Sequence, residues 1–348
     1  MPNIKDVAER AHVSSTTVSH VLNNTRYVDP RTKSRVLAAM EELGYRPNAV
    51  ARSLRRQETL TIGIVVHDLG NPFFTSFVKC VESVAQQAGY NVILCSSGEN
   101  PERMKSVLEV LSAKRVDGLM VSPVSQEDPT LISIERHGTP VVYLGRRPLG
   151  ASGPEVHDNS LGAAISAIQH LADDGHVRIG VITGCLAVPS LAERMAAYRQ
   201  VLEQRGLAFD ERMVKVNNFS VDDAKRSMRA LLELDRPPTA VFTTNMLMTT
   251  GALAALHEAR VRCPQEMALV GYDDSDWASI FNPPLTVLRQ PTERGAIAAA
   301  ELLLGYMRGE KAMEQEIVLP AELVVRGSCS ESCLRRMTGE MEEVVTRE

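Results

Sequence analysis

The chain has 348 residues, of which 44% are hydrophobic and 23% charged, so it is a globular protein long enough for two or three domains. No apolar run is long enough to span a membrane, and residues 1–3 lead into a predicted helix without a signal peptide, so we expect a cytoplasmic protein with no membrane partner. The six cysteines are scattered without a CxxC pair, which indicates reduced core or tail residues and not disulfides or zinc ligands.

The net charge of −5 is unevenly distributed along the chain. Residues 1–58 carry ten Lys and Arg against six Asp and Glu, which gives +4 and leaves −9 for the remainder. The overall acidic charge alone would argue against a nucleic-acid partner. A basic N-terminal segment on an acidic body is instead expected when a single domain contacts phosphates.

Residues 4–23 predict two short helices joined by a tight turn. In the first helix, apolar residues recur at helical spacing, at Ile4, Val7, Ala8 and Ala11. His12 and Val13 form the turn, and Ser14 is placed to cap a second helix over residues 15–23. One face of this second helix is apolar and the other carries small polar side chains, which is typical of a helix-turn-helix.

A third amphipathic helix follows, with Asp29 as its expected cap and Pro30 in its first turn. The residues expected to face the core are Val36, Leu37, Met40 and Leu43. Because helices this short bury little surface alone, all three must share one small core. An ordinary three-helix bundle with a polar face is the alternative interpretation.

Three segments of the first 56 residues have a characteristic sequence and spacing: IKDVAERAHVSSTTVSHVLN, ELGYRP and NAVARSL. They resemble the DNA-binding headpiece of the lactose-repressor/galactose-repressor (LacI/GalR) family, which includes lactose-, purine- and ribose-repressor types. The resemblance implies a transcriptional regulator that binds double-stranded DNA as a homodimer. Two headpieces on a two-fold axis would require a pseudo-palindromic operator.

The resemblance also implies roles for single residues of a helix-turn-helix domain over residues 1–47. Its second helix would enter the major groove, where Ser15, Thr16 and His20 would read base edges. The residues that would position the DNA backbone are Thr17, Ser19, Asn23 and Tyr45.

Residues 48–58 predict a hinge. A helix of two turns is marginal in water, so without DNA this segment is expected to be a linker. By resemblance it is a hinge helix that orders on the operator and pairs with its copy in the other subunit. Ala51 would lie within that helix, Leu54 would be an apolar wedge between bases in the minor groove, and Arg55 would face phosphates.

From Leu60 the pattern changes to short β-rich runs separated by helical stretches. The nine runs are LTIGIVV, YNVILCS, VDGLMVS, TPVVYLG, RIGVITG, RMVKVNN, PTAVFTT, MALVGYD and LTVLRQ. This alternation predicts an α/β fold with two doubly wound parallel sheets.

By resemblance, residues 59–330 form a periplasmic-binding-protein-like domain for effector binding and dimerisation. Its first lobe would comprise about residues 60–160 and 291–319, and its second about 161–290 and 320–330. The polar residues 331–348 are expected to be a disordered tail, whose weak heptad pattern leaves dimer versus tetramer open.

Ligands of open parallel sheets bind beyond the carboxyl ends of the strands. The residues predicted near those ends to bind an effector are Asn71, Phe73, Phe74, Arg146, Arg194, Phe219, Asn245, Asp273 and Gln290. Aromatic rings that stack on C–H faces, together with side chains that bond neighbouring hydroxyls, suit a sugar. These positions also match those of sugar-binding family members. Singly, the phenylalanines would fit a core, and Asn245 and Asp273 would fit helix caps, so the set carries the inference.

Two positions depart from the family pattern. Gly145 stands before Arg146 where the family often has Asp, and Met246 follows Asn245 where Asp is usual. Both departures remove hydroxyl acceptors, so the identity of the sugar stays open. Trp277, the only tryptophan, either lines the cleft or packs on a short surface helix.

Two rival classes fit less well. An enzyme is disfavoured because the chain lacks a GxxxxGK[ST] loop, a GxSxG elbow and a GxGxxG after its first strand. The His67-Asp68 and His157-Asp158 pairs have no third ligand in view, so no catalytic residue, metal or cofactor is expected. A periplasmic sugar-binding protein would lack the headpiece. The expected function is a repressor whose operator affinity is changed by a sugar or sugar derivative, with a purine-type corepressor as the alternative.

Overall fold

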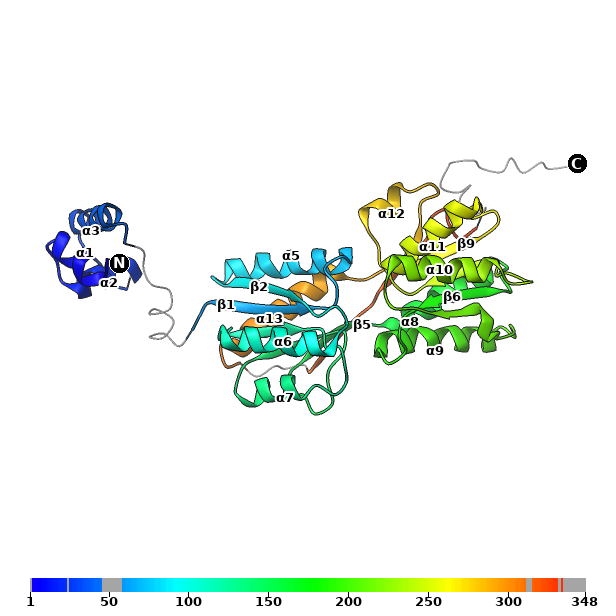
Figure 1. The fold of residues 1–348 in the computed structure, drawn as a ribbon, viewed down its shortest axis with the longest axis horizontal. Coiled ribbons are helices and arrows are strands. Elements are labelled where there is room, and N and C mark those ends of the chain that lie inside the picture. Colours follow the sequence, from blue (N-terminus) through cyan, green and yellow to red (C-terminus); the bar gives the residue numbers. More distant parts are fainter. Residues whose placement is uncertain (1, 24, 46–57, 311–314, 331–332, 334–348) are drawn as a thin grey trace, which may run out of the picture. The chain divides into compact units, whose positions relative to one another are not determined.

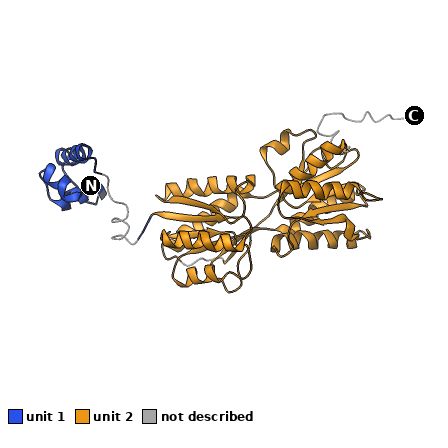
Figure 2. Ribbon diagram, viewed as in Figure 1, with its two compact units in different colours: residues 1–59 blue, residues 60–348 orange. Residues whose placement is uncertain are grey.

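The computed structural model describes residues 2–23, 25–45, 58–310, 315–330 and 333 (Figure 1). The chain forms two compact units, residues 1–59 and residues 60–348, which we call the headpiece and the sensor unit (Figure 2). Across the described residues, no helix is long and apolar enough to cross a membrane.

The headpiece contains the three predicted helices, which are α1 (Ile4–Arg10), α2 (Ser15–Asn23) and α3 (Pro30–Leu43). Side-chain caps define where they begin. Ser14 Oγ accepts a hydrogen bond from the backbone nitrogen of Thr17 at 3.1 Å, and Asp29 Oδ2 accepts one from that of Arg31 at 3.0 Å. Both predicted caps are therefore confirmed.

One small core holds the three helices together. Its buried members are Val7, Ala8, Ala11, Val18, Val21, Val36 and Ala39. Leu37 was expected in this core, but 48% of it is exposed. It follows Val36 by one residue, which rotates it about 100° around α3, away from the stripe formed by Val36, Ala39 and Met40.

The sensor unit contains two six-stranded sheets. The strands of the first are β1 (Thr61–Val66), β2 (Asn91–Ser96), β3 (Gly118–Val121), β4 (Val141–Leu144), β5 (Glu155–Asp158) and β11 (Glu316–Leu319), in the order β11-β5-β4-β3-β1-β2. Those of the second are β6 (Ile179–Thr183), β7 (Val214–Val216), β8 (Ala240–Thr243), β9 (Ala268–Tyr272), β10 (Thr286–Arg289) and β12 (Glu322–Val324), in the order β12-β10-β9-β8-β6-β7.

All nine predicted strands are present, and the two doubly wound sheets are confirmed. The antiparallel pairing of β12 with β10 is the exception to the parallel arrangement. The strands β5, β11 and β12 were not predicted; they are short and only partly buried.

Helices cover both faces of each sheet, as expected for parallel sheets. On the first sheet, α5 (Pro72–Gln87) and α13 (Thr292–Met307) pack on one face, and α6 (Pro101–Ala113) and α7 (Pro129–Arg136) on the other. On the second, α8 (Ser160–Asp173) and α9 (Pro189–Gln204) oppose α10 (Val221–Leu232) and α11 (Met246–Ala259). The 3-10 helix η1 (Glu211–Met213) precedes β7, and α12 (Asp276–Ile280) follows β9.

Each sheet with its helices forms one lobe, and we call them lobe one and lobe two in chain order. The chain passes from lobe one to lobe two between β5 and α8, returns between β10 and α13, and passes again between β11 and β12. The two lobes therefore share three crossings, and the carboxyl ends of β5, β10 and β11 all point toward them.

Candidate functional site

The second helix of the headpiece presents small polar side chains at its surface. Thr16 is exposed, and Ser15 and Thr17 are half-buried. The hydroxyl of Thr17 also lies 2.9 Å from that of Ser14, so the cap holds this side chain at the start of α2. Hydroxyl groups so placed can donate to or accept from base edges and can donate to phosphate oxygens.

His20 and Tyr45 are held by the headpiece itself. A hydrogen bond of 2.8 Å joins His20 Nδ1 to Thr25 Oγ1, which fixes the ring at the end of α2. Tyr45 packs against the headpiece core, and Ser19 is half-buried. The side chain of Asn23 and the hinge residues Ala51, Leu54 and Arg55 lie outside the described part of the chain.

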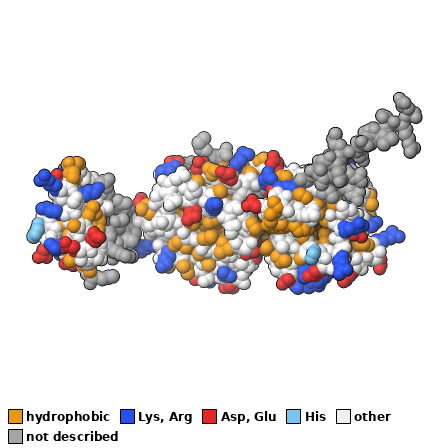
Figure 3. Space-filling view, turned by 90° about the horizontal axis from the view of Figure 1, so that it is seen from above, with side chains coloured by type: hydrophobic (Ala, Val, Ile, Leu, Met, Phe, Trp, Pro, Cys, Tyr) orange, Lys and Arg blue, Asp and Glu red, His pale blue; other side chains and the backbone are white. Residues whose placement is uncertain are grey.

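Cationic side chains stand at the headpiece surface (Figure 3). The exposed ones include Arg26, Arg31, Lys33 and Arg35. Arg10 is instead committed to an ion pair with Glu42 at 2.5 Å. The headpiece thus combines hydrogen-bonding groups on one helix with the positive charge that DNA phosphates require.

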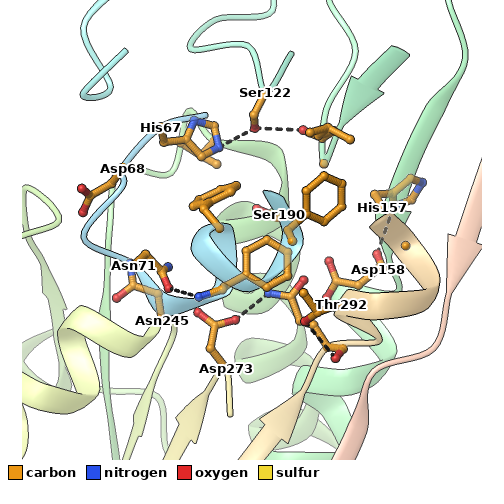
Figure 4. Close-up of a pocket in the computed structure, with 18 of the residues that line it drawn as sticks. His67, Asp68, Asn71, Ser122, His157, Asp158, Ser190, Asn245, Asp273 and Thr292 are labelled. Atoms are coloured by element: carbon orange, nitrogen blue, oxygen red, sulfur yellow. Dashed lines mark hydrogen bonds between the residues drawn. The ribbon is translucent and has the colours of Figure 1, made fainter. Parts of the chain in front are cut away.

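A second candidate site is a cavity walled by both lobes of the sensor unit (Figure 4). The space within it amounts to about 1130 Å³, a volume that includes open solvent at its mouth. His67, after β1, and Leu144, at the end of β4, contribute from lobe one, and Asn245 and Asp273 follow strands of lobe two. The cavity therefore lies at the carboxyl ends of both sheets.

Aromatic rings form the apolar part of the wall. Phe73, Phe74 and Phe77 lie on the first turns of α5, and Phe219 faces them from lobe two as a further lining residue. The rings of Phe73 and Phe74 meet edge to face with centroids 5.0 Å apart. Such a surface can stack on the C–H face of a sugar or on a heterocyclic ring.

His67 anchors the polar part of the lobe-one wall. Its Nε2 lies 2.6 Å from Ser122 Oγ, and that hydroxyl donates to the carbonyl oxygen of Leu144 at 2.9 Å. Arg146 Nη2 lies 3.1 Å from His67 Nδ1 and 3.3 Å from Nε2, and Glu99 Oε1 lies 3.3 Å from Nδ1. Burial and the nearby Arg146 hold the pKa of His67 well below the usual 6.5, so the ring is neutral.

Glu99 completes this cluster. Arg146 Nη2 donates to its two carboxylate oxygens at 3.3 and 3.2 Å, and the Arg146 side chain is only 4% exposed. Burial raises the pKa of the Glu99 carboxyl, and Arg146 opposes that rise. Glu99 and His67 line the cavity, whereas Arg146 lies behind them and holds them in place.

Arg194 is the central cation of the lobe-two wall. Its Nη1 donates to the carbonyl oxygen of Thr244 at 2.6 Å, its Nη2 donates to Ser160 Oγ at 3.1 Å, and its guanidinium stacks 3.3 Å over the ring centroid of Tyr272. Asp158 Oδ2 lies 3.8 Å from Nη2 and accepts a short hydrogen bond from the Tyr272 hydroxyl. Among the described residues, Arg194 Nε is a buried donor with no partner.

Asp273 and Gln290 form a pair at the crossing between the lobes. Gln290 Nε2 donates to Asp273 Oδ1 at 2.5 Å, and the backbone nitrogen of Met246 donates to Asp273 Oδ2 at 3.3 Å. Burial raises the pKa of the Asp273 carboxyl, against the opposing effects of Arg194 and Gln290. Asn245 lies beside them and caps α11, since its Oδ1 accepts from Met248 at 2.9 Å.

Comparison with known proteins identifies the chain. A model of bacterial regulatory proteins of the lacI family matches residues 3–48, and a periplasmic binding protein-like domain matches residues 168–329. The ribose operon repressor of Escherichia coli (strain K12) is 36% identical over 329 residues, which cover 94% of this chain and 100% of that relative. The chain belongs to the LacI family.

Other LacI-family relatives are almost as similar. The HTH-type transcriptional repressor PurR of Vibrio campbellii is 35% identical, with 94% of this chain and 98% of the relative covered. Among solved structures, the lac repressor dimer bound to operator and the anti-inducer ONPF aligns with a TM-score of 0.81 at 28% identity, covering 94% of this chain and 99% of that one. The complex of the transcriptional regulator CelR with cellobiose aligns with a TM-score of 0.69 at 33% identity, covering 94% and 100%.

Within this LacI-family chain, the cavity brings together most residues predicted to bind an effector. Those that line it are Asn71, Phe73, Phe74, Arg194, Phe219, Asn245, Asp273 and Gln290. Arg146 is the exception, because its side chain turns back to His67 and Glu99. Trp277 packs against the core beneath α10 and α11 and does not line the cavity.

Several lining residues were not predicted as effector ligands. They include His67, Glu99, Ser122, Asp158, Ser190 and Thr292. His67 follows the first predicted strand directly, so the same reading of strand ends that selected Asn71 would have found it. Asp158 ends β5, and it was missed because that strand was missed.

Proposed function

We propose that this LacI-family chain is a transcriptional repressor whose affinity for operator DNA is changed by a sugar or sugar derivative bound between its two lobes. The main support is that residues of both lobes line one cavity. A ligand that contacts both walls binds best at one relative angle of the lobes, so its binding favours that angle over others. Ligand and operator are then coupled through the conformation of the sensor unit.

The chemistry of the wall favours a neutral, hydroxyl-rich ligand. It offers carboxylates that accept hydrogen bonds, at Asp68, Glu99, Asp158 and Asp273, beside the donor Arg194 and a patch of phenylalanine rings. A phosphorylated ligand would meet more negative than positive charge. A buried Arg194 Nε without a partner among the described residues is expected to gain an acceptor when a ligand enters.

A purine-type corepressor is the second candidate. It is supported by the PurR relatives, whose 35% identity is nearly that of the ribose operon repressor at 36%, so overall similarity does not separate the two. The rings of Phe73 and Phe74, which meet edge to face, could also stack on a heterocyclic ring. A corepressor would raise operator affinity, whereas an inducing sugar would lower it.

We propose that α2 of the headpiece enters the major groove of the operator. Ser15, Thr16 and His20 would contact base edges, and Thr17, Ser19, Asn23 and Tyr45 the backbone. The hinge residues Ala51, Leu54 and Arg55 would engage the minor groove of a pseudo-palindromic operator bound by a homodimer. The protein would act in the cytoplasm, where its DNA lies, and would catalyse no reaction.

Selection of genomic DNA fragments by the purified protein, repeated across salt concentrations, tests the proposal. We expect enrichment of a pseudo-palindrome with a central pyrimidine–purine step. Adding ribose, cellobiose and purine bases separately to the same assay then separates the candidates: a sugar that releases the fragment supports induction, and a purine that tightens binding supports corepression. Weak, sequence-blind binding under every condition would contradict the assignment of the headpiece.

A further inference from the structure

A cluster of four potential metal ligands lies in lobe two, away from the cavity. His170 is in the last turn of α8 and Asp174 is its C-terminal cap, while Cys329 and Cys333 come from the C-terminal segment. One ligand atom of each residue lies within 4.8 Å of all the others. Cys329 and Cys333 are 0% and 2% exposed, and the side chains of His170 and Asp174 are 19% and 17% exposed.

The spacing of these atoms is close to that of a tetrahedral zinc shell. His170 Nε2 lies 3.1 Å from Cys329 Sγ and 3.5 Å from Asp174 Oδ2, and Cys333 Sγ lies 3.9 Å from that same oxygen. Ligands that are about 2.0–2.3 Å from a tetrahedral zinc ion lie roughly 3.3–3.8 Å apart. These three distances lie within a few tenths of an ångström of that range, and the remaining separations, all within 4.8 Å, would close by up to about 1 Å when zinc binds.

The surroundings favour a cation and fix the ligands. The carboxyl end of a helix carries partial negative charge, and His170 and Asp174 stand at that end of α8. Thr286 Oγ1 donates to Cys329 Sγ at 3.2 Å, the kind of outer hydrogen bond that orients a metal-bound thiolate. Ser328 fixes the segment next to Cys329, since its hydroxyl donates to the carbonyl oxygen of Leu269 at 2.6 Å.

We propose that His170, Asp174, Cys329 and Cys333 bind one zinc ion, which ties the C-terminal segment to the end of helix α8. Two thiolates, an imidazole and a carboxylate suit zinc better than magnesium or calcium, which prefer oxygen ligands alone. Four protein ligands leave no open position, so the site is structural and not catalytic.

The site would clamp parts of the chain that are far apart in sequence. His170 and Cys329 are separated by 159 residues. Helix α8 has 14 residues and spans roughly 21 Å, with Ser160 beside Arg194 of the cavity at its other end. Bound zinc would therefore stabilise the helix that also carries part of the cavity wall.

The test uses the full chain, purified under reducing conditions, stripped with a chelator and titrated with zinc. We expect about one zinc ion to bind per chain, and cobalt(II) in its place to give the thiolate charge-transfer band and the intense visible bands of a tetrahedral site. Zinc should also raise the melting temperature of the stripped protein. Cys329→Ser or Cys333→Ser alone should reduce the charge-transfer band to about half, and the two changes together should abolish it. His170→Gln, at a partly exposed position, should weaken zinc binding at least about tenfold.

Cys80→Ser is the matched control, because Cys80 is a partly buried cysteine on α5 in lobe one, and it should bind zinc like the unaltered chain. The proposal is wrong if the reduced, unaltered chain binds no zinc, or if His170→Gln and the Cys80→Ser control bind it equally. It is also wrong if peptide mapping of the chain purified without reductant finds a Cys329–Cys333 disulfide and the reduced chain shows no cobalt band.

Discussion

A hydrogen bond of 2.6 Å joins His67 Nε2 and Ser122 Oγ in the lobe-one wall of the cavity. The Ser122 hydroxyl also lies 2.9 Å from the carbonyl oxygen of Leu144, and when it donates its proton there its oxygen accepts from His67 Nε2. Nδ1 lies 3.1 Å from Arg146 Nη2 and 3.3 Å from Glu99 Oε1. The ring is kept neutral by burial, and a second proton would place a positive charge beside Arg146.

This arrangement predicts a pH dependence of stability. The pKa of His67 in the folded chain lies below its unfolded value of about 6.5. Between these two pKa values the unfolded chain binds more protons than the folded chain, so stability falls as the pH decreases through this window. Glu99 has a raised pKa and acts in the opposite direction at the acidic side of the same window. His67→Gln keeps a donor for Ser122 but cannot titrate, so we expect it to flatten the loss of stability between about pH 7 and about pH 5.

Urea unfolding followed by the fluorescence of Trp277, the only tryptophan, measures this in the sensor unit. Equal slopes of stability against pH for His67→Gln and the unaltered chain would contradict the assignment of His67.

Replacement of Arg194 should impair both stability and effector binding. Arg194→Lys retains a charge but cannot reach Thr244 and Ser160 together or stack on Tyr272, so buried acceptors lose their partner. We expect a loss of roughly 3 kcal/mol of unfolding free energy and at least about a tenfold loss in effector affinity. Arg199→Lys, on the same helix but outside the cavity lining, is the control.

Two headpiece variants should separate base reading from phosphate binding. His20→Ala should change which bases are preferred, with effects of about 1–3 kcal/mol at the contacted position. Arg35→Ala, at an exposed cation, should weaken binding to all sequences and reduce the salt slope by about 1. Binding assays on permuted operators at several salt concentrations measure both, and a uniform loss for His20→Ala would contradict its role.

Neighbouring positions of α3 offer a test of the headpiece core. Val36 is fully buried, so Val36→Ala should lower local stability by about 1–3 kcal/mol. Leu37 is 48% exposed, so Leu37→Ala should cost less than about 0.5 kcal/mol although it removes more atoms. Hydrogen exchange of headpiece amides in the full chain, read by mass spectrometry, compares the two. Equal protection in both variants would contradict the observed facing of α3.

Sequence patterns predicted correctly those elements whose formation depends on residues close to one another in the chain. Apolar runs bounded by turn residues predicted the nine main strands, and capping residues such as Ser14 and Asp29 predicted helix starts. The strands β11 and β12 were missed because they are short strands at sheet edges without a fully buried residue, so their sequences carry little apolar signal. Their positions depend on pairing with distant segments, β5 and β10.

Side-chain directions and contacts between distant residues could not be predicted from the sequence either. Arg146 follows a strand as predicted, but the half-buried Glu99 holds it behind the wall, and nothing in the local sequence pairs these two residues. The proximity of Cys329 to His170 is likewise invisible in cysteine spacing, because the fold alone brings them together across 159 residues.

The three crossings between the lobes constrain how this architecture can be recombined. Neither lobe is one continuous stretch of sequence, since α13 and β11 return to lobe one after all of α8–α12 has been made. A chimaera of two relatives with a single junction at the first crossing would unite α5 of one parent with α13 of the other, across a packed interface that includes Phe77 and Ala296. Exchange of an intact lobe instead needs a junction at every crossing, so specificity is more easily altered residue by residue in the cavity wall than by shuffling gene fragments.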